Sequence, residues 1–470
     1  MTKHWKQKKI EKTWLAHRSH FILVIVPVRL PVLAFAFLAI TFLYTWSLNS
    51  TGIITPDEPR YAAIAKHMAD SSDFISPILW GEPWFEKPAL LYWLSAVGFK
   101  LGLPGEFAPR LPIAICSVLF LVFYYKALSK ILDSRDTALT AVTMLSTTVY
   151  WFAFSQVAVT DLPLAATFTG TLLAVLAGWR RAAAVLFGLA LLAKGAVAAA
   201  LLLPLVWLKR HEWRRWIVPG VGAIAVASVW YVPMTLKFGW TFWQVFFVEH
   251  HLGRFANPAL QHVQPFWFYL PIVLAAMVPW TPMILGRRIF QESNTKAFFW
   301  TAVWCVFFFS CFMNKLPGYI LPAVPSLCVV AAVRYQKSQR KALLLCLSLM
   351  CLMVVLLAAQ LVPVAVNSGI KRQALASLTF PWGVIPLAIL CFRPSLRAVA
   401  AASFLCFAWF QATKLAEVNA LGSARPRWEK MKAQPESQCV GDVPRSIRYG
   451  LNYYANRTLP DCNAGEKPND

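Results

Sequence analysis

Long apolar segments separated by short basic turns are the feature that most constrains this chain. One apolar segment covers about residues 21–48, and others follow from residue 111 to residue 414. A membrane-spanning helix needs about 20 predominantly apolar residues. Only 14% of the residues are charged, whereas a soluble domain has about 25%. The sequence therefore predicts an all-α polytopic membrane protein.

Thirteen membrane crossings are predicted, starting from the cytoplasm because residues 1–20 form a basic arm. The expected spans are 21–48, 111–131, 136–153, 162–178, 182–193, 196–208, 216–233, 266–285, 297–312, 319–333, 342–364, 377–392 and 398–414. With this count, every loop placed in the cytoplasm carries Lys or Arg, as the positive-inside rule requires. The same clusters explain the formal net charge of +24, so nucleic-acid binding is a poor interpretation of that charge.

The region 182–208 leaves an alternative open. Two short helices that meet at Lys194-Gly195 preserve the pattern of basic loops. A single helix would place Lys194 at mid-membrane and reverse every later loop, so we favour two helices. The expected organisation is then a cytoplasmic arm (1–20), a transmembrane domain (21–414) and a short outer tail (415–470). The transmembrane domain has large outer loops at 49–110 and 236–265.

The tail has few apolar positions, so we expect no substantial core in it. It contains Cys439 and Cys462, which could form a disulfide if the tail lies outside the cytoplasm. The other cysteines lie in apolar segments and have no metal-site spacing.

The segment 55–110 contains seven of the 21 acidic residues. Carboxylates beside a bilayer are costly unless they hold water, a partner or a substrate, so we expect the active site here. Thr55 or Asp57 can cap a helix, in which Asp57 would lie beside Arg60 and Tyr61. We also expect amphipathic juxtamembrane helices in this loop. A helix that merely lies on the membrane is the alternative, but it does not explain the adjacent acids Asp57 and Glu58.

Further ionisable groups lie at the ends of predicted spans, on the same side as this loop. Lys87 could extend to the interface or pair with a lipid phosphate, and the sequence favours neither. Asp161 could simply cap a helix, and Lys315 near Tyr319 could also extend to the interface. The set is completed by Lys194, Glu249, His250 and Arg254. Together these groups are typical of a cavity that opens to the outer face.

Nucleotide and zinc motifs are absent from the sequence, including the P-loop, the dinucleotide fingerprint and HExxH. Because no nucleotide site is predicted, an activated donor must reach the outer face without a nucleotide carrier. A donor carried on a lipid would meet that need. No cofactor is predicted, and the sequence leaves open whether the protein needs a divalent metal ion.

Several blocks of sequence together resemble the bacterial aminoarabinose transferase family. The blocks are DEPRYAAIAKHM, FEKPALLYWLSAVGFKLG, EFAPRLP, TDLP, LLAKG, EHHLGRF and NKLPGYILPAVP, which occur in this order within about residues 20–335. These C-type membrane glycosyltransferases use polyprenyl-phosphate sugar donors and are distantly similar to protein O-mannosyltransferases. Pro59 departs from the family pattern, and the tail is shorter, which leaves the acceptor open.

The resemblance implies a role for each candidate. Asp57 matches the essential carboxylate, Glu58 its acidic neighbour and Asp161 the second acidic position. The donor phosphate would be bound by Lys87, with Arg254 and Lys315. The cavity would be lined by Arg60, Tyr61, Glu86, Lys194, Glu249, His250 and Tyr319.

The implied function is transfer of a sugar from undecaprenyl phosphate to a lipid A-like or surface-glycan acceptor. The reaction would take place at the periplasmic face of the bacterial inner membrane, with the N-terminus in the cytoplasm and the C-terminus in the periplasm. A protein O-glycosyltransferase of the same superfamily is the nearest alternative. A transporter or flippase of lipid-linked sugars is less favoured, because the sequence shows no internal two-fold repeat.

Overall fold

The computed structural model describes residues 26–208, 210–212, 214–252, 263–285, 293–335, 340–358, 394–433 and 439–462. The chain divides into two units, Met1–Leu43 and Tyr44–Asp470. The first unit contains most of helix α2 (Val26–Thr45), which lies within the first expected span. The basic arm 1–20, the expected span 377–392 and Arg254 lie outside the described residues.

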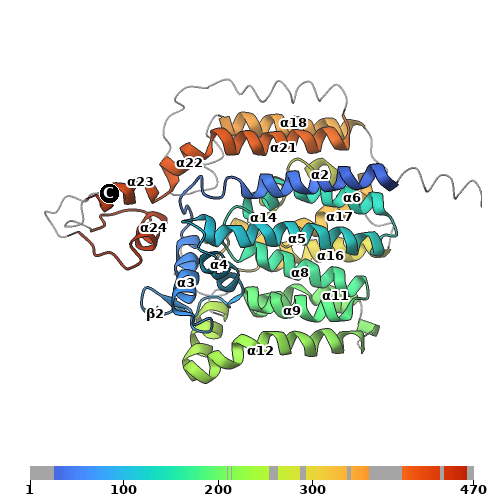
Figure 1. Cartoon of the computed structure of the whole chain (residues 1–470). Coiled ribbons are helices and arrows are strands. Elements are labelled where there is room, and N and C mark those ends of the chain that lie inside the picture. Colours follow the sequence, from blue (N-terminus) through green and yellow to red (C-terminus); the bar gives the residue numbers. More distant parts are fainter. Residues whose placement is uncertain are drawn as a thin grey trace, which may run out of the picture. The chain divides into compact units, whose positions relative to one another are not determined.

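The second unit is a helical bundle with a group of shorter elements at one end (Figure 1). Its bundle helices include α5 (Phe107–Ile131), α6 (Arg135–Ser146), α7 (Val149–Phe154), α8 (Asp161–Leu176), α9 (Arg180–Lys194), α10 (Ala196–Leu201), α11 (Leu203–Leu208), α12 (Arg214–Trp243), α14 (Tyr269–Ala276), α15 (Thr281–Ile284), α16 (Ser293–Ser310), α17 (Ala323–Tyr335), α18 (Arg340–Ala358) and α21 (Leu396–Thr413). Helix α9 packs between α8 and α12, and α17 packs against α6 and α16. The prediction of a mainly helical protein is confirmed.

Three helical segments of the described residues are long and apolar enough to cross a membrane. They are Phe107–Ile131, Trp216–Glu249 and Leu396–Thr413. Other apolar helices are shorter, such as Asp161–Leu176 and Ala323–Tyr335. Helices therefore occupy the expected spans wherever the chain is described, but several of them have fewer residues than a straight crossing requires.

Helix breaks in the bundle follow from local residues. The chain is interrupted at Gly195, where φ is 61° and ψ is −139°, so the expected meeting of two short helices is confirmed. The expected span 136–153 is split between α6 and α7 at Thr147 and Thr148, whose hydroxyls donate to carbonyls of the preceding turn.

The expected loop 236–265 is helical in its first part. Helix α12 continues across a kink at Gly239 to Trp243, and a π-helix, η2 (Gln244–Leu252), follows it. Aromatic packing explains the continuation, because Trp230 lies 5.5 Å from Phe242 and 6.3 Å from Phe246, centroid to centroid. These contacts bury Phe242 and Phe246 completely, which favours helix over loop.

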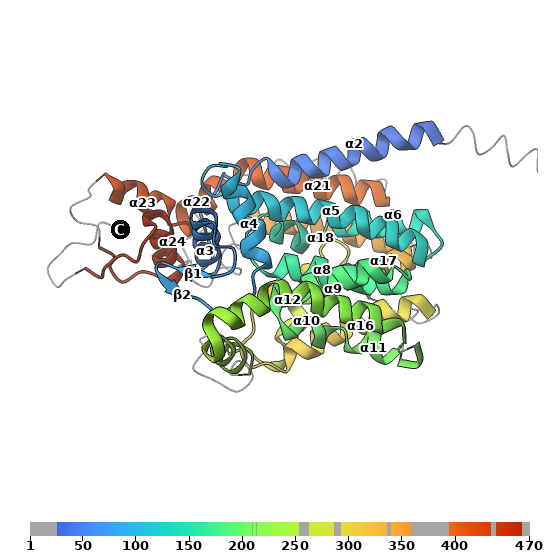
Figure 2. The ribbon, with the colours of Figure 1, turned by 60° about the horizontal axis from the view of Figure 1, so that its bottom comes forward.

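The first loop, residues 49–110, is built from helix α3 (Glu58–Ser71), a β-hairpin and helix α4 (Leu90–Lys100). The hairpin pairs β1 (Ile78–Leu79) with β2 (Glu82–Pro83). Its turn residues, Trp80 and Gly81, both have positive φ (51° and 98°), as a type I′ turn requires. Figures 1 and 2 show α3 and α4 at the end of the bundle where the last helices of the chain also lie.

Those last helices form the C-terminal cap, defined here as residues 415–433 and 439–462. It contains α22 (Leu415–Gly422), α23 (Arg425–Lys432) and α24 (Arg445–Ala455). The tail, expected to lack a substantial core, has a small one, which consists of Ala424, Met431, Val440, Ile447, Leu451 and Leu459. Ile447 and Leu451 are one helical turn apart and bury one face of α24. Cys439 and Cys462 form a disulfide that joins the ends of the second part of the cap.

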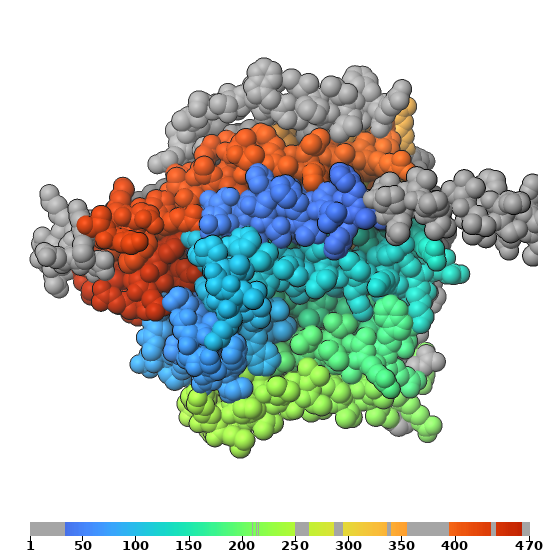
Figure 3. All heavy atoms as spheres, viewed as in Figure 1, coloured from blue at the N-terminus to red at the C-terminus, as the bar shows by residue number. Residues whose placement is uncertain are grey.

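The cap lies directly against the first loop, as the adjoining red and blue surfaces in Figure 3 show. Arg425 binds Glu106 through two contacts of 2.9 and 2.7 Å. The backbone N–H of Gly52 donates to Asn419 at 2.7 Å. Gly52 permits this close approach, since a Cβ there would lie 2.0 Å from the hydroxyl of Ser423.

Candidate active site

The start of α3 brings several predicted site residues to one place. Thr55, rather than Asp57, caps the helix: its hydroxyl accepts a hydrogen bond of 3.1 Å from the N–H of Glu58. The β-hairpin then returns the chain toward α3, and the N–H of Trp84 donates to the carbonyl of Pro77 at 2.8 Å. The segment that follows Trp84 carries Glu86 and Lys87.

Ion pairs link four of the predicted residues into a series, here called the charge chain: Asp57, Arg60, Glu86 and Lys87. Arg60 binds Asp57 with one terminal nitrogen and Glu86 with the other, the second contact measuring 3.1 Å. Lys87 binds the remaining oxygen of Glu86 at 2.9 Å. The side chains of Arg60, Glu86 and Lys87 are 6–9% exposed, whereas that of Asp57 is 32% exposed. Anions and cations therefore alternate, and the carboxylate of Asp57 is the member most open to a ligand.

Arg60 remains charged within this chain. Burial lowers the pKa of its guanidinium, but the neighbouring carboxylates of Glu86 and Asp57 outweigh burial and raise the pKa above its usual value. A buried charge is tolerated when it is paired and hydrogen-bonded. Arg60 meets that condition, because it pairs with Asp57 and Glu86 and its Nε donates to the carbonyl of Pro56 at 3.2 Å.

Three aromatic rings surround the Arg60 guanidinium. Its Cζ lies 5.9 Å from the ring centroid of Tyr61 and 5.3 Å from those of Trp84 and Tyr449. These distances fall within the range of cation–π contact. Tyr449 belongs to α24 of the C-terminal cap and was not predicted as a site residue. Nothing in the spacing of the sequence links position 449 with position 60.

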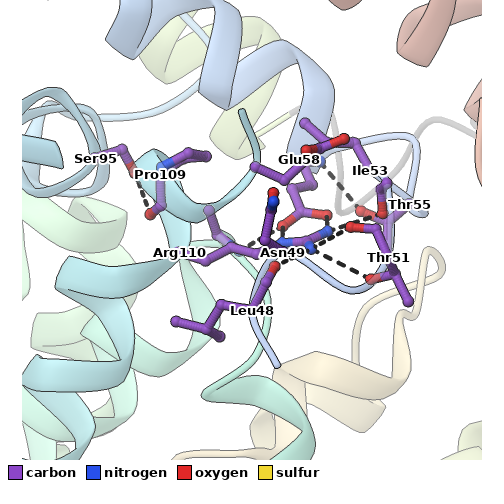
Figure 4. Close-up of polar contacts among 12 residues, drawn as sticks. Leu48, Asn49, Thr51, Ile53, Thr55, Glu58, Ser95, Pro109 and Arg110 are labelled. Carbon is purple, nitrogen blue, oxygen red and sulfur yellow. Dashed lines mark hydrogen bonds and ion pairs between the residues drawn. The ribbon is translucent and has the colours of Figure 1, made fainter. Parts of the chain in front are cut away.

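Glu58 has a different environment from its neighbour Asp57. It is completely buried, and its carboxylate accepts hydrogen bonds of 2.7 and 2.9 Å from Arg110 and of 3.0 Å from the N–H of Ala158. Figure 4 shows the Arg110 guanidinium between Glu58 and the backbone of the segment that precedes α3. The prediction grouped Glu58 with the catalytic acids, but here both of its oxygens are engaged by protein groups. Arg110 lies in the quoted block EFAPRLP, although we did not predict it as a site residue.

Asp161, Lys194 and Tyr319 form a second cluster. Asp161 is the first residue of α8, and Lys194 is the last of α9; their side chains form an ion pair of 2.9 Å. The ammonium of Lys194 lies 4.0 Å from the ring centroid of Tyr319, which follows Gly318 in the 3-10 helix η4 (Pro317–Ile320). A Cβ at Gly318 would lie 2.9 Å from a carboxylate oxygen of Asp161, so glycine permits this close approach.

Three further predicted residues lie on other segments: Lys315 shortly before η4, and Glu249 and His250 on η2. Lys315 is buried, and its ammonium donates to the carbonyls of Gln264, at 2.9 Å, and Phe312. Burial lowers the pKa of Lys315. Glu249 is exposed on η2, and the backbone of His250 lies in the same helix.

The two clusters are suited to binding an anion and orienting a nucleophile. Lys87 and Lys194 each contact a carboxylate, Lys194 also lies over the Tyr319 ring, and an ammonium can bind a phosphate as a compact charge. A partly exposed carboxylate such as Asp57 can accept a proton or orient a hydroxyl. Among the residues that the structure describes, no group of three or more His, Cys, Asp or Glu side chains could hold a metal ion.

Comparison with known sequences supports the resemblance. The family model for dolichyl-phosphate-mannose-protein mannosyltransferase matches residues 86–236. The undecaprenyl phosphate-alpha-4-amino-4-deoxy-L-arabinose arabinosyl transferase of Edwardsiella ictaluri is 30% identical over 307 residues, which are 60% of this chain and 55% of that protein. A second protein of that name, from Sodalis glossinidius, is 31% identical over 62% of this chain and 58% of its own length. The chain thus matches little more than half of the length of these relatives.

Comparison with solved structures extends the likeness to nearly the whole chain. The crystal structure of ArnT from Cupriavidus metallidurans bound to undecaprenyl phosphate superposes with a TM-score of 0.76 at 20% identity, covering 93% of this chain and 87% of that one. The apo form of the same protein gives a TM-score of 0.74 at 21% identity. The predicted resemblance is thereby confirmed: this chain is similar in sequence to the aminoarabinose transferases and has the ArnT-like fold.

Proposed function

We propose that the protein is a glycosyltransferase that moves a sugar from a polyprenyl phosphate, such as undecaprenyl phosphate, to a lipid A-like or surface-glycan acceptor. The observation that carries the proposal is the charge chain on the first loop, in which Arg60 and Glu86 link the partly exposed carboxylate of Asp57 to the buried ammonium of Lys87. The relatives named for transfer of aminoarabinose from undecaprenyl phosphate support this choice of donor.

In the proposed reaction, the acceptor attacks the anomeric carbon of the donor sugar, and the bond between that carbon and the lipid phosphate breaks with inversion. Lys87, assisted by Arg254 and Lys315, neutralises the charge that develops on the leaving phosphate. If the acceptor is a hydroxyl, Asp57 takes its proton as general base. If the acceptor is an ionised phosphate, no base is needed, and Asp57 orients neighbouring groups of the site instead.

The other candidate residues have supporting roles in the proposal. Asp161 and Lys194 orient substrate groups beside Tyr319, while Tyr61, Glu249 and His250 line the cavity. Glu58 holds the start of α3 through Arg110 rather than touching the substrate, because both of its oxygens are bound.

We place the enzyme in the bacterial inner membrane with thirteen crossings. Residues 1–20 are the cytoplasmic arm and 21–414 the transmembrane glycosyltransferase domain, whose loops 49–110 and 236–265 face the periplasm. Residues 415–470 are the periplasmic tail. The contacts between the cap and the first loop support placing these two segments on one side.

Mass spectrometry of lipid A and of polyprenyl-phosphate sugars in a deletion strain and its parent tests the function. Loss of one sugar from lipid A, with its lipid-linked donor accumulating, supports the proposal and identifies both substrates. No change in either pool would refute it. Unchanged lipid A with an accumulated donor would keep the transferase chemistry and move the acceptor to another glycan or to protein. A glycoprotein that loses its sugar in the deletion strain would then favour a protein O-glycosyltransferase, a second candidate supported by the mannosyltransferase family match.

Variants assign the roles within the site. Asp57→Asn should lower kcat about 100-fold or more if the carboxylate is a general base. Lys87→Ala should raise the KM for the donor about tenfold or more, because one charge-assisted hydrogen bond contributes about 1.5–3 kcal/mol. Lys100→Ala is the control, since Lys100 is an exposed lysine of the same loop whose ammonium donates to the hydroxyl of Ser72. Wild-type kinetics for both site variants would contradict the assignment.

A further inference from the structure

The C-terminal cap is fixed to the first loop by polar contacts centred on the buried carboxylate of Glu106. Glu106 is 4% exposed and accepts hydrogen bonds from Arg425 and from the hydroxyl of Tyr454. Arg425 also donates to the carbonyl of Asn49 at 3.1 Å. Buried ionic groups need partners in a specific geometry, so these contacts define how the cap sits on the loop.

Small residues hold α24 close to the start of α23. A Cβ at Gly450 would lie 2.5 Å from the Cβ of Ala424, so only glycine allows the two segments to approach this closely. Tyr449 immediately precedes Gly450. The position of the Tyr449 ring is therefore set by the packing of the cap.

The Tyr449 ring is held in contact with the charge chain. Its centroid lies 5.9 Å from that of Trp80, and its hydroxyl accepts a hydrogen bond of 3.2 Å from Arg445. The Cζ of Arg60 lies 5.3 Å from the same ring. The ring thus bridges the hairpin of the first loop, the cap and the guanidinium that binds Asp57.

We infer that Tyr449 is a positioning residue that acts through Arg60 on the candidate catalytic carboxylate of Asp57. Arg60 binds Asp57 and Glu86 at the same time, which requires its planar guanidinium to keep one orientation. Trp84 and Tyr449 lie against that guanidinium, and removal of the tyrosine ring leaves space into which it can rotate. The cap is then part of the active site although it supplies no group to the reaction, and this inference rests on the proposed function.

The test compares initial rates of the purified full chain with undecaprenyl phosphate-4-amino-4-deoxy-L-arabinose as donor and lipid A as acceptor. Tyr449→Ala should lower kcat about 3- to 30-fold, the range expected for loss of one partly buried cation–π contact. The KM for the donor should change less than twofold, because Lys87 is untouched. Tyr449→Phe should restore kcat, since it keeps the ring.

Coupling to Arg60 distinguishes positioning from a general effect on folding. In an Arg60→Lys background, which keeps the charge but not the planar fork, Tyr449→Ala should cause little further loss. Arg448→Ala is the matched control, because Arg448 is in the same helix and pairs with Asp461 of the cap. It should leave kcat unchanged.

The outcomes separate this inference from the proposed function. An active wild-type protein whose Tyr449→Ala variant has unchanged kcat would overturn the role of Tyr449 alone. Additive losses in the Arg60→Lys background would also overturn it, because Tyr449 would then act independently of Arg60. A wild-type protein that transfers no sugar would overturn the proposed function and this inference together.

Discussion

Arg110 joins the start of α3 to the segment that precedes it. Its guanidinium donates to both oxygens of Glu58 and to the carbonyls of Leu48, Thr51 and Gly52, and it is 1% exposed. The side chain of Glu58 is 0% exposed, so removal of Arg110 leaves a buried carboxylate without its ion-pair partner. Removing one partner of a buried pair is costly because it leaves the other charge uncompensated.

Arg110→Ala should therefore reduce the free energy of unfolding by about 3–5 kcal/mol. Denaturant unfolding of the purified protein in detergent measures this change. Lys66→Ala is the matched control: Lys66 pairs with Asp70 at 3.1 Å, with side chains 36% and 62% exposed, and an exposed pair contributes about 0.5 kcal/mol or less. Equal losses in both variants would contradict a structural role specific to Arg110.

The same residue shows how far the site could be read from the sequence. The pairing of Asp57 with Arg60 follows from helical spacing, so it could be predicted. The different roles of the adjacent acids Asp57 and Glu58 could not be predicted, because the contact that distinguishes Glu58 is made by Arg110, 52 positions away in the sequence. Contacts over such separations depend on the tertiary fold and leave no local pattern.

At the scale of elements, the sequence was most informative where the distribution of charge constrains the order of helices and loops. The basic loops favoured a break at Lys194-Gly195, and the structure has a break there. The core of the C-terminal cap was harder to predict from the sequence, because single apolar residues from several short segments form it. The turn at Trp80-Gly81 was also missed: tryptophan is an unusual residue at positive φ, and glycine alone is a weak signal.

Gly195→Ala should destabilise the bundle. With φ at 61° and ψ at −139°, Gly195 occupies a region that is essentially open only to glycine, and a side chain there costs about 1–3 kcal/mol. Gly220→Ala is the control, because Gly220 lies within α12 and a Cβ there meets open space. The Tm of the purified protein should fall for Gly195→Ala and stay level or rise slightly for Gly220→Ala. A level Tm in both would mean that the chain between α9 and α10 can adopt an ordinary backbone conformation.

At the scale of the whole molecule, the proposed orientation places the first loop and the C-terminal cap in the periplasm. Helix α5 begins at the end of this loop and has 25 residues, which at about 1.5 Å per residue exceeds a hydrocarbon core of about 30 Å. His67 on α3 and Arg135 at the start of α6 therefore lie toward opposite ends of α5, and both are exposed.

Labelling of single cysteines tests this orientation. Cysteines outside the disulfide are replaced by alanine, and a membrane-impermeant maleimide is added to spheroplasts. His67→Cys should react at once, and Arg135→Cys only after lysis, because the maleimide does not cross the inner membrane. Cys439 and Cys462 should react only after reduction, since an oxidising periplasm favours their disulfide. The opposite pattern would place the charge chain in the cytoplasm, away from the face at which we propose transfer, and would reverse every loop assignment that depends on the basic arm.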